Sequence, residues 1–351
     1  MKRALLRFRS PLVQEEIHSD TLFGAICWGY RWLYGEEALE RLLQGFRENN
    51  PPFLLSSCFP YIEAEGERVY LYPKPAASAA CCKADAEEDF MKKFRKLRYV
   101  SEGLFRKMCS CAEVEDTGKH GLGKREVPGF RMGGERYVVD EGIALEAEVA
   151  EKLVEDGRRF GRGALRIISS YEKPGVAVNR LSISPEETLH FRREHYLAPD
   201  SGLYFLIDGG SRVLGEVEAV LRFLADRGIG GKVSCGRGAF EFAGFGDAEL
   251  EEPGDAFVTL SLYLPKKGEL SAFDGGRSWY EPVVRKGMLE CSFVKVRNPW
   301  KQKLLMFAEG SVFPAAGGKP FGRCEIVRQE PFEVLHYGYA FAVNFRRGGD
   351  G

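Results

Sequence analysis

A glycine-rich stretch places the strongest constraint on the fold. Residues 228–242 read GIGGKVSCGRGAFEF, with five glycines in the first eleven positions. Apolar residues at helical spacing from Val213 to Leu224 precede it, and AFEFAGF after it is typical of a strand. Nucleotide-binding glycine loops run the other way, from a strand into the helix whose N-terminus holds the phosphate. Because Lys232 is also followed by Val233 and not by Ser or Thr, the sequence disfavours a metabolic nucleotide-binding enzyme.

Two interpretations of this loop stay open. Its glycines would let backbone N–H groups approach an extended anion closely, with Lys232 and Arg237 neutralising charge and Ser234 donating a hydrogen bond. That arrangement fits a phosphodiester chain. Alternatively, Gly228 only ends a helix, and the rest is a tight turn into the next strand.

Overall charge limits how the chain can bind nucleic acid. It has 351 residues and a formal net charge of -1. Proteins that coat DNA without sequence preference rely on summed positive charge, so a nucleic-acid role here must rest on local patches. One such patch lies within residues 157–182, which contain six basic residues and one acidic residue. The alternative is an ordinary solvated face.

Cysteine usage and the N-terminus indicate a cytoplasmic protein. The nine cysteines lack the spacing of a secreted disulfide scaffold, and MKRALLRFRS lacks the apolar core of a signal peptide. No segment approaches the ~18 uninterrupted apolar residues that a membrane-spanning helix needs.

The order of predicted elements indicates an α+β fold in two parts, residues 1–250 and 255–351, joined by the acidic segment DAELEEPGDA. Both parts mix strands and helices in the β-α-β-β-α-β manner, although the second has few helices. The first part is expected to hold a helical and loop insertion at about 76–156 with solvated faces. It is also expected to hold a long hairpin at about 165–200 and the glycine-rich loop at 228–238.

Four motifs together resemble a known family. They are HSDTLFGAI at 18–26, NR at 179–180 before a hairpin strand with FRREHY, the late glycine loop, and HYGYAFAV near the C-terminus. This combination is similar to the RAMP superfamily of CRISPR proteins, and most of all to its Cas-five group, which includes the fourth subunit of type III-A Csm effector complexes. The resemblance spans nearly the whole chain and is weakest over 76–156.

The resemblance implies two tandem ferredoxin-like (RRM-like) domains and a non-catalytic RNA-binding subunit that acts in antiviral defence. Such a subunit holds the repeat-derived 5′ handle of the guide RNA and contacts the large Cas-ten subunit and the first backbone RAMP subunit. Carried over by position, the RNA-contacting residues fall in the glycine loop, in the thumb-like hairpin and its approach, and at the start of the first long helix. They are Gly230, Gly231, Lys232, Ser234, Gly236, Arg237 and Gly238; Arg166, Asn179 and Arg180; and His18, Ser19 and Thr21.

Catalytic and metal-binding roles have weaker support in the sequence. Some RAMP proteins cleave precursor RNA with a histidine, and His18 is the one histidine near the expected groove, so an endoribonuclease with His18 as general acid or base is the alternative function. No partner acid or base is visible beside it. Cys109, Cys111 and His120 lack zinc-site spacing, so we expect no metal or other cofactor. Tyr337, Tyr339 and Phe341 alternate along a strand and are either a base-stacking platform or core.

Overall fold

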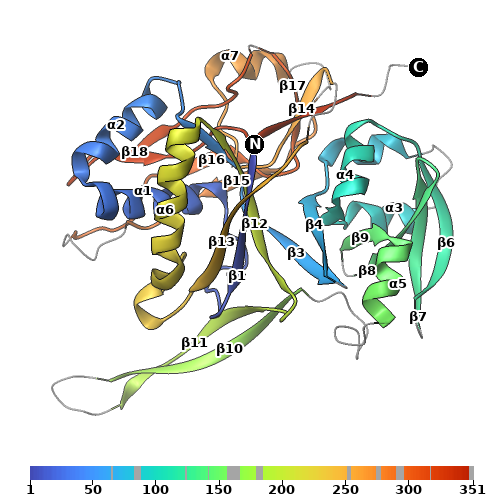
Figure 1. The fold of residues 1–351 in the computed structure, drawn as a ribbon, viewed down its shortest axis with the longest axis horizontal. Coiled ribbons are helices and arrows are strands. Elements are labelled where there is room, and N and C mark those ends of the chain that lie inside the picture. Colours follow the sequence, from blue (N-terminus) through green and yellow to red (C-terminus); the bar gives the residue numbers. More distant parts are fainter. Residues whose placement is uncertain are drawn as a thin grey trace.

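The computed structural model describes residues 1–64, 66–82, 88–122, 125–140, 142–155, 167–178, 185–250, 254–273, 278–289, 296–316 and 318–347. Its largest element is an 11-stranded sheet in the order β13-β1-β12-β3-β4-β5-β9-β8-β7-β6, with β2 also pairing with β12 (Figure 1). The strands are β1 Lys2–Phe8, β2 Phe53–Leu55, β3 Phe59–Ala64, β4 Glu67–Pro73, β5 Tyr99–Ser101, β6 Val114–Leu122, β7 Arg125–Met132, β8 Glu135–Asp140, β9 Ile143–Glu146, β12 Ser201–Gly209 and β13 Phe240–Asp247. Neighbouring strands are antiparallel except β5 and β9.

Three helices cover one face of β13-β1-β12: α1 Ser19–Tyr34, α2 Glu36–Arg47 and α6 Ser211–Arg227 (Figure 1). Along β12 every residue from Ser201 to Ile207 is buried, because alternate side chains enter different clusters: Phe205 packs with the helices and Tyr204 enters the cluster on the opposite face. Helix α1 ends before Gly35, which has a φ of 86°. The fold class is therefore α+β, as predicted.

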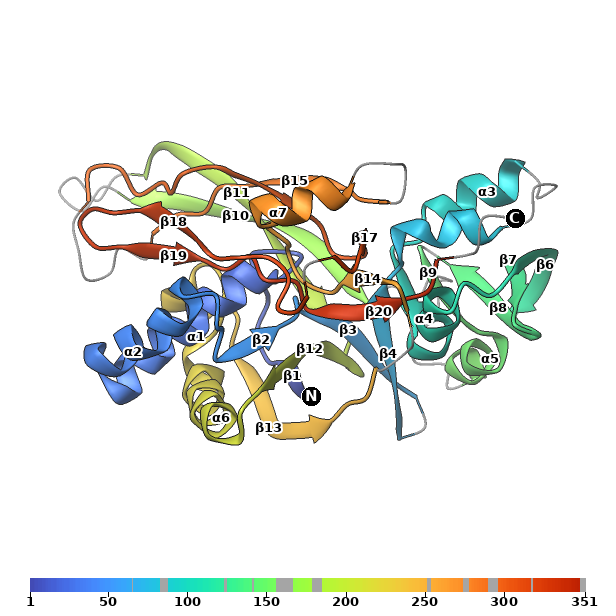
Figure 2. The same ribbon diagram turned by 90° about the horizontal axis from the view of Figure 1, so that it is seen from above.

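The segment at 76–156 contains helices, as predicted, but also five strands that the prediction of a helical and loop insertion with solvated faces did not include. It contains η1 Ala76–Cys81, α3 Glu88–Arg95, α4 Glu102–Cys109, α5 Ala147–Glu155 and strands β5–β9, and it lies at one end of the molecule in both views (Figure 2). Strand β5 pairs with β4, so the insertion extends the main sheet. Its core combines aromatic residues such as Phe90, Phe94 and Phe130 with aliphatic residues from its strands and helices, which the many alternating charges obscure in the sequence.

The C-terminal part is built from small sheets. A three-stranded sheet has the order β17-β14-β20 (Val312–Pro314, Ala256–Thr259, Ala342–Phe345). Strand β15 Pro282–Arg285 pairs with β16 Leu304–Phe307, and β18 Glu325–Arg328 pairs with β19 Val334–His336. Within the described part of 254–347, the helices are α7 Lys267–Leu270 and η3 Ser271–Phe273. The tandem ferredoxin-like arrangement is thus not confirmed, and the boundary at 250 to 255 stays a prediction.

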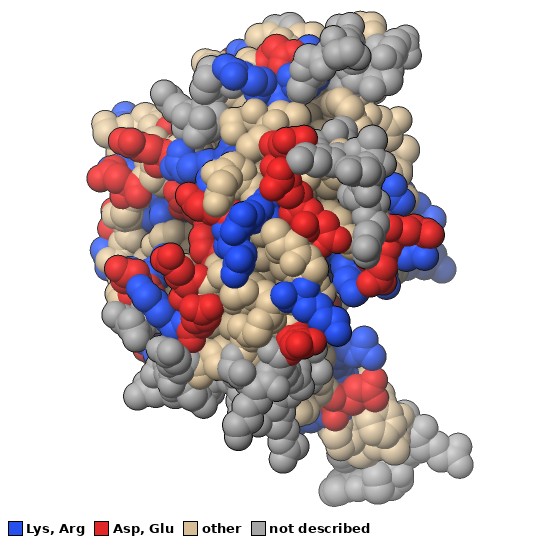
Figure 3. Space-filling view, turned by 90° about the vertical axis from the view of Figure 1, so that its right-hand side faces the viewer, with Lys and Arg blue, Asp and Glu red and all other residues tan. Residues whose placement is uncertain are grey.

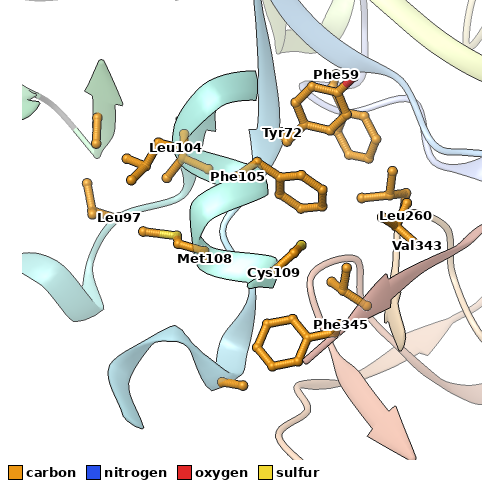
Figure 4. Packing of buried hydrophobic residues seen from close by; sticks show 14 of the residues in the cluster. Phe59, Tyr72, Leu97, Leu104, Phe105, Met108, Cys109, Leu260, Val343 and Phe345 are labelled. Atoms are coloured by element: carbon orange, nitrogen blue, oxygen red, sulfur yellow. The ribbon is translucent and has the colours of Figure 1, made fainter. Parts of the chain in front are cut away.

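The core joins all three parts of the chain. Phe59 from the main sheet, Phe105 from the insertion, and Leu260 and Phe345 from the C-terminal part belong to one buried cluster (Figure 4). Tyr337, Tyr339 and Phe341 are buried as well, so they are core residues and not a base-stacking platform. No helix among the described residues combines the length and the apolar character needed to cross a membrane.

Phe105 tests whether the insertion shares the main core. Its side chain is fully buried and stacks on Tyr72 at a centroid distance of 4.8 Å. We expect Phe105→Ala to lower the free energy of unfolding by about 3–5 kcal/mol, since the cavity would lie where the parts meet. Phe191→Ala, at an exposed position, should change it by about 0.5 kcal/mol or less. Urea denaturation would measure both, and equal effects would contradict the shared core.

Candidate nucleic-acid interface

The neck of the glycine loop is held by two close backbone approaches. The N–H of Gly228 donates to Leu224 O at 2.7 Å, and that of Ile229 donates to Gly238 O at 3.0 Å. A Cβ on Gly238 would lie 2.0 Å from Ile229 O. Gly238 is buried and donates its own N–H to Pro11 O at 3.0 Å. Gly238 therefore shapes the loop, and its place among the residues that line the RNA stays a prediction.

The tip of the loop presents the remaining predicted groups. Lys232 is exposed and has a left-handed backbone, with φ 59°, at the start of the short turn η2 Val233–Cys235. Ser234 and Gly236 are also exposed, and Gly236 donates its N–H to Val233 O. Among the described residues, no hydrogen bond engages the backbone N–H of Gly230, Gly231 or Lys232. The tip thus offers three backbone donors and one ammonium to an anion.

Arg237 ties the loop to the base of the hairpin. Its Nε and Nη2 lie 2.9 and 2.7 Å from Oε1 of the buried Glu194, and Tyr196 donates to Oε2 of the same carboxylate at 3.1 Å. Burial raises the pKa of Glu194, but the bonds from Arg237 and Tyr196 outweigh it and the pKa is lowered. Arg237 therefore has a positioning role. Its partner Glu194 was missed, although it stands within the FRREHY motif.

The hairpin consists of β10 Ile168–Val178 and β11 Pro185–Leu197 and projects from the body of the molecule (Figure 1). Its base is fixed by two hydrogen bonds between the backbones of Leu12 and His195, at 2.9 and 2.8 Å. The two strands pair Lys173 with Arg192 and Val176 with Leu189. Since neighbouring pairs alternate between faces, Tyr171 shares the face of Lys173 and Arg192, while the face of Val176 and Leu189 also carries the Glu172–Arg193 ion pair. Arg166, Asn179 and Arg180 lie outside the described residues.

The start of α1 is buried more deeply than predicted. Ser19 is fully buried: its N–H donates to Ser57 Oγ at 2.8 Å, and its Oγ accepts from Leu262 N–H at 3.1 Å. The Oγ of Thr21 donates to Asp20 Oδ1 at 3.2 Å. Ser19 therefore does not face a groove, because its hydroxyl joins the helix to the C-terminal part.

His18 precedes α1 and lies between two carboxylates. Its Nδ1 is 2.9 Å from Glu309 Oε1, and its Nε2 is 3.3 Å from Glu16 Oε2. Burial lowers the His18 pKa, but the hydrogen bond and charge of Glu309 outweigh it, so the pKa lies above its ordinary value. The pKa of the buried Glu309 is correspondingly lowered by His18 and by the hydroxyl of Ser57.

Asp20, in the first turn of α1, forms a second ionic contact. Arg285 donates from Nε to Oδ2 and from Nη2 to Oδ1, both at 2.9 Å. Burial raises the Asp20 pKa, and the guanidinium of Arg285 more than compensates, so the carboxylate stays ionised. His336 lies 3.5 Å from the same carboxylate, and burial lowers its pKa to about 4. The sequence carries no local signal for this contact, since Asp20 and Arg285 are far apart in the chain.

A cleft of about 800 Å³ opens beside His18, between the main sheet, the insertion and the C-terminal part. Lys74 lies in its wall, and burial together with the nearby Arg95 lowers the Lys74 pKa to about 8. Among the described residues, no carboxylate lies within ion-pair distance of Lys74. Over the outer face of the insertion, Lys and Arg alternate with Asp and Glu and form no single basic surface (Figure 3).

No group of three or more His, Cys, Asp or Glu is placed to hold a metal ion in the part of the chain that the structure describes. Cys109 is buried in the core, and His120 Nε2 lies 3.0 Å from Glu151 Oε1. Cys109 therefore contributes to core packing, and His120 to a contact with Glu151.

Comparison with known proteins places the chain in a family. A RAMP superfamily model matches residues 5–241, and a model described as CRISPR Csm4 C-terminal domain matches residues 252–345. The chain therefore belongs to the RAMP superfamily. The resemblance to the type III-A subunit that the sequence motifs indicated is confirmed.

Curated relatives and solved structures extend over the same length. CRISPR system Cms protein Csm4 of Thermococcus onnurineus is 28% identical, over 93% of this chain and 90% of that protein, and its Methanocaldococcus jannaschii counterpart is 25% identical, over 84% and 78%. The fold is similar to a chain in a Csm3-Csm4 subcomplex of the type III-A interference complex (TM-score 0.64, 19% identity, 99% and 100% coverage). It is also similar to a chain in a Csm1-Csm4 cassette bound to pppApA (TM-score 0.58, 22% identity, 100% and 99% coverage).

The His18 contact predicts a pH dependence of stability. Its folded pKa lies above the value of about 6.5 expected in the unfolded chain, so the contact contributes fully below that pH and is lost as the pH rises through the folded pKa. We expect wild type to be more stable than His18→Gln near pH 6, with the difference shrinking as the pH rises. Urea denaturation over a pH series would measure it, with the exposed His190→Gln as control. A difference that grows with pH would contradict the assignment.

Proposed function

We propose that this chain is a non-catalytic RNA-binding subunit of a type III-A CRISPR (Csm) interference complex and holds the repeat-derived 5′ handle of the guide RNA. The observation that carries the proposal is the tip of the glycine loop, where exposed Lys232 and three backbone N–H groups lie beside a projecting hairpin. Phosphate contacts of this kind fix the register of an RNA without reading its sequence.

The hairpin would act together with the loop. The Arg237–Glu194 pair fixes the angle between them, so an RNA held at the loop passes the hairpin at a defined place. The hairpin face that carries Lys173 and Arg192 would contact phosphates, and Tyr171, which is 62% exposed, offers a ring for base stacking. Handle and spacer would therefore be separated at the hairpin.

Assembly with other subunits follows from the relatives. Structures similar to this chain were solved as Csm3-Csm4 and Csm1-Csm4 complexes. We propose the corresponding partners here, a large Cas-ten subunit and a backbone RAMP subunit, in a cytoplasmic complex for antiviral defence. The full-length match to curated Csm4 proteins supports this assignment.

The surroundings of His18 bear on the choice between binding and catalysis. Both ring nitrogens face carboxylates, those of Glu309 and Glu16. A carboxylate beside one ring nitrogen is also the arrangement that orients a general base, so this geometry fits both an ion-pair role and the endoribonuclease alternative. The non-catalytic role rests on the glycine loop, and the His18→Ala variant below tests the alternative.

Lys232→Glu should weaken retention of the guide RNA. Loss of one charge-assisted phosphate contact costs about 1.5–3 kcal/mol, or roughly 10- to 100-fold in affinity. For a synthetic RNA with the 5′ handle, the slope of log affinity against log salt concentration should also become shallower, by the amount expected for about one lost phosphate contact. Arg41→Glu reverses an exposed charge on α2 and is the matched control. Equal RNA occupancy in purified complexes of Lys232→Glu, Arg41→Glu and wild type would refute the site.

His18→Ala separates binding from catalysis. Because we propose no chemistry at His18, guide RNAs sequenced from the mutant complex should have the same 5′ ends and lengths as those from wild type. Accumulation of unprocessed precursor, with the complex still assembled, would instead support the endoribonuclease function.

A further inference from the structure

An uncovered apolar face lies on the ribbon formed by β15 and β16. Val284 pairs directly with Leu305, and these side chains are 60% and 64% exposed. The pairing continues past the strands, because Met288 forms a bridge with Trp300 and Leu289 N–H donates to Pro299 O at 2.8 Å. Met288 and Trp300 are 55% and 46% exposed. Four large apolar side chains thus lie exposed along one ribbon.

The opposite side of the ribbon is part of the core. Met306 is fully buried, in a cluster with Leu262 and Leu264. Arg285 points inward to the buried carboxylate of Asp20. The ribbon therefore has apolar residues on both faces, one packed and one uncovered, and an ion pair joins it to α1. Exposed patches of this kind mark interaction sites in proteins.

Lysines flank the apolar residues. The Nζ of Lys286 lies 4.9 Å from the ring centroid of Trp300, and Lys303 stands two residues before Leu305 on the same strand face. We call the set of Val284, Lys286, Met288, Trp300, Lys303 and Leu305 the ribbon face. It contains two cations and no carboxylate, within a chain of net charge -1.

We propose that the ribbon face is a docking surface for another protein subunit, one that presents an apolar centre with Asp or Glu around it. This rests on the proposed function in a multi-subunit complex. The aliphatic side chains of Val284, Leu305 and Met288 decide between protein and RNA. Single-stranded RNA is bound by aromatic stacking and cationic grooves, and an aliphatic centre would desolvate phosphates without compensation. A partner surface with an apolar centre would pack against the aliphatic residues, and carboxylates around that centre would pair with the lysines.

Zero-length carbodiimide cross-linking of the purified wild-type complex tests the contact directly. The reagent joins an amine to a carboxylate only where the two touch. We expect Lys286 or Lys303 to be joined to Asp or Glu of another protein subunit, as identified by mass spectrometry. Absence of any such cross-link, with other intersubunit cross-links present, would overturn the proposal.

A variant pair tests the energetics in the same complex. Val284→Asp with Leu305→Asp places two charges in the apolar centre and should reduce recovery of one protein subunit by at least about tenfold. Leu270→Asp, at an exposed position on α7, is the control and should retain every subunit.

Two results would separate the inference from the proposed function. A wild-type chain that copurifies with no partner subunit would refute the proposed function and this inference with it. A variant complex that keeps every protein subunit would refute only the inference, and loss of RNA alone from that complex would assign the ribbon face to RNA.

Discussion

The partly buried ion pair between Asp20 and Arg285 joins the two parts of the chain. Removing a carboxylate and a guanidinium from water is costly, and the two hydrogen bonds at 2.9 Å offset that cost only when both partners are in place. Around the pair, Ser19 Oγ accepts from Leu262 N–H and His18 contacts Glu309, so the first turn of α1 is joined to the C-terminal part at three points. Loss of Arg285 would leave the Asp20 carboxylate, with a side chain only 9% exposed, without its guanidinium partner. The start of α1 is therefore a fixed point of the fold, and its polar residues serve structure before function.

The proposed RNA-binding surface extends from this fixed point. The segment that precedes α1 contacts both neighbouring elements: Pro11 accepts from Gly238 in the glycine loop, and Leu12 pairs with His195 at the base of the hairpin. The ion pair between Arg237 and Glu194 joins the glycine loop directly to the hairpin. Loop, hairpin and helix are thus mutually positioned by backbone contacts and one ion pair. These contacts hold the exposed groups at the loop tip in place before RNA binds, which lowers the entropy cost of holding an RNA.

Local patterns predicted the elements better than the contacts between residues remote in sequence. Helical spacing and the order of helix, glycine loop and strand were sufficient for α6 and the loop at 228–238, because both signals lie within about thirty residues. Ser19, Gly238 and Arg237 were predicted as RNA contacts, yet each has a partner remote in sequence: Leu262, Pro11 and Glu194. Nothing local distinguishes an arginine paired with a buried glutamate from an exposed one. The strands of the insertion were missed because its buried residues are scattered among charged ones and because β5 pairs with β4 across a long sequence separation.

The charge of the chain explains why it would work within an assembly. With a net charge of -1, no long-range field attracts RNA, so affinity must come from a few local contacts. Three backbone donors and one lysine at the loop tip would give only weak binding on their own, and that binding would weaken further with salt. Joining several such surfaces along one guide converts weak contacts into strong retention by effective concentration. That gain requires subunits held by contacts other than RNA, and contacts between apolar surfaces depend little on salt. The ribbon face, apolar at its centre and remote in sequence from the glycine loop, has the chemistry for such a contact.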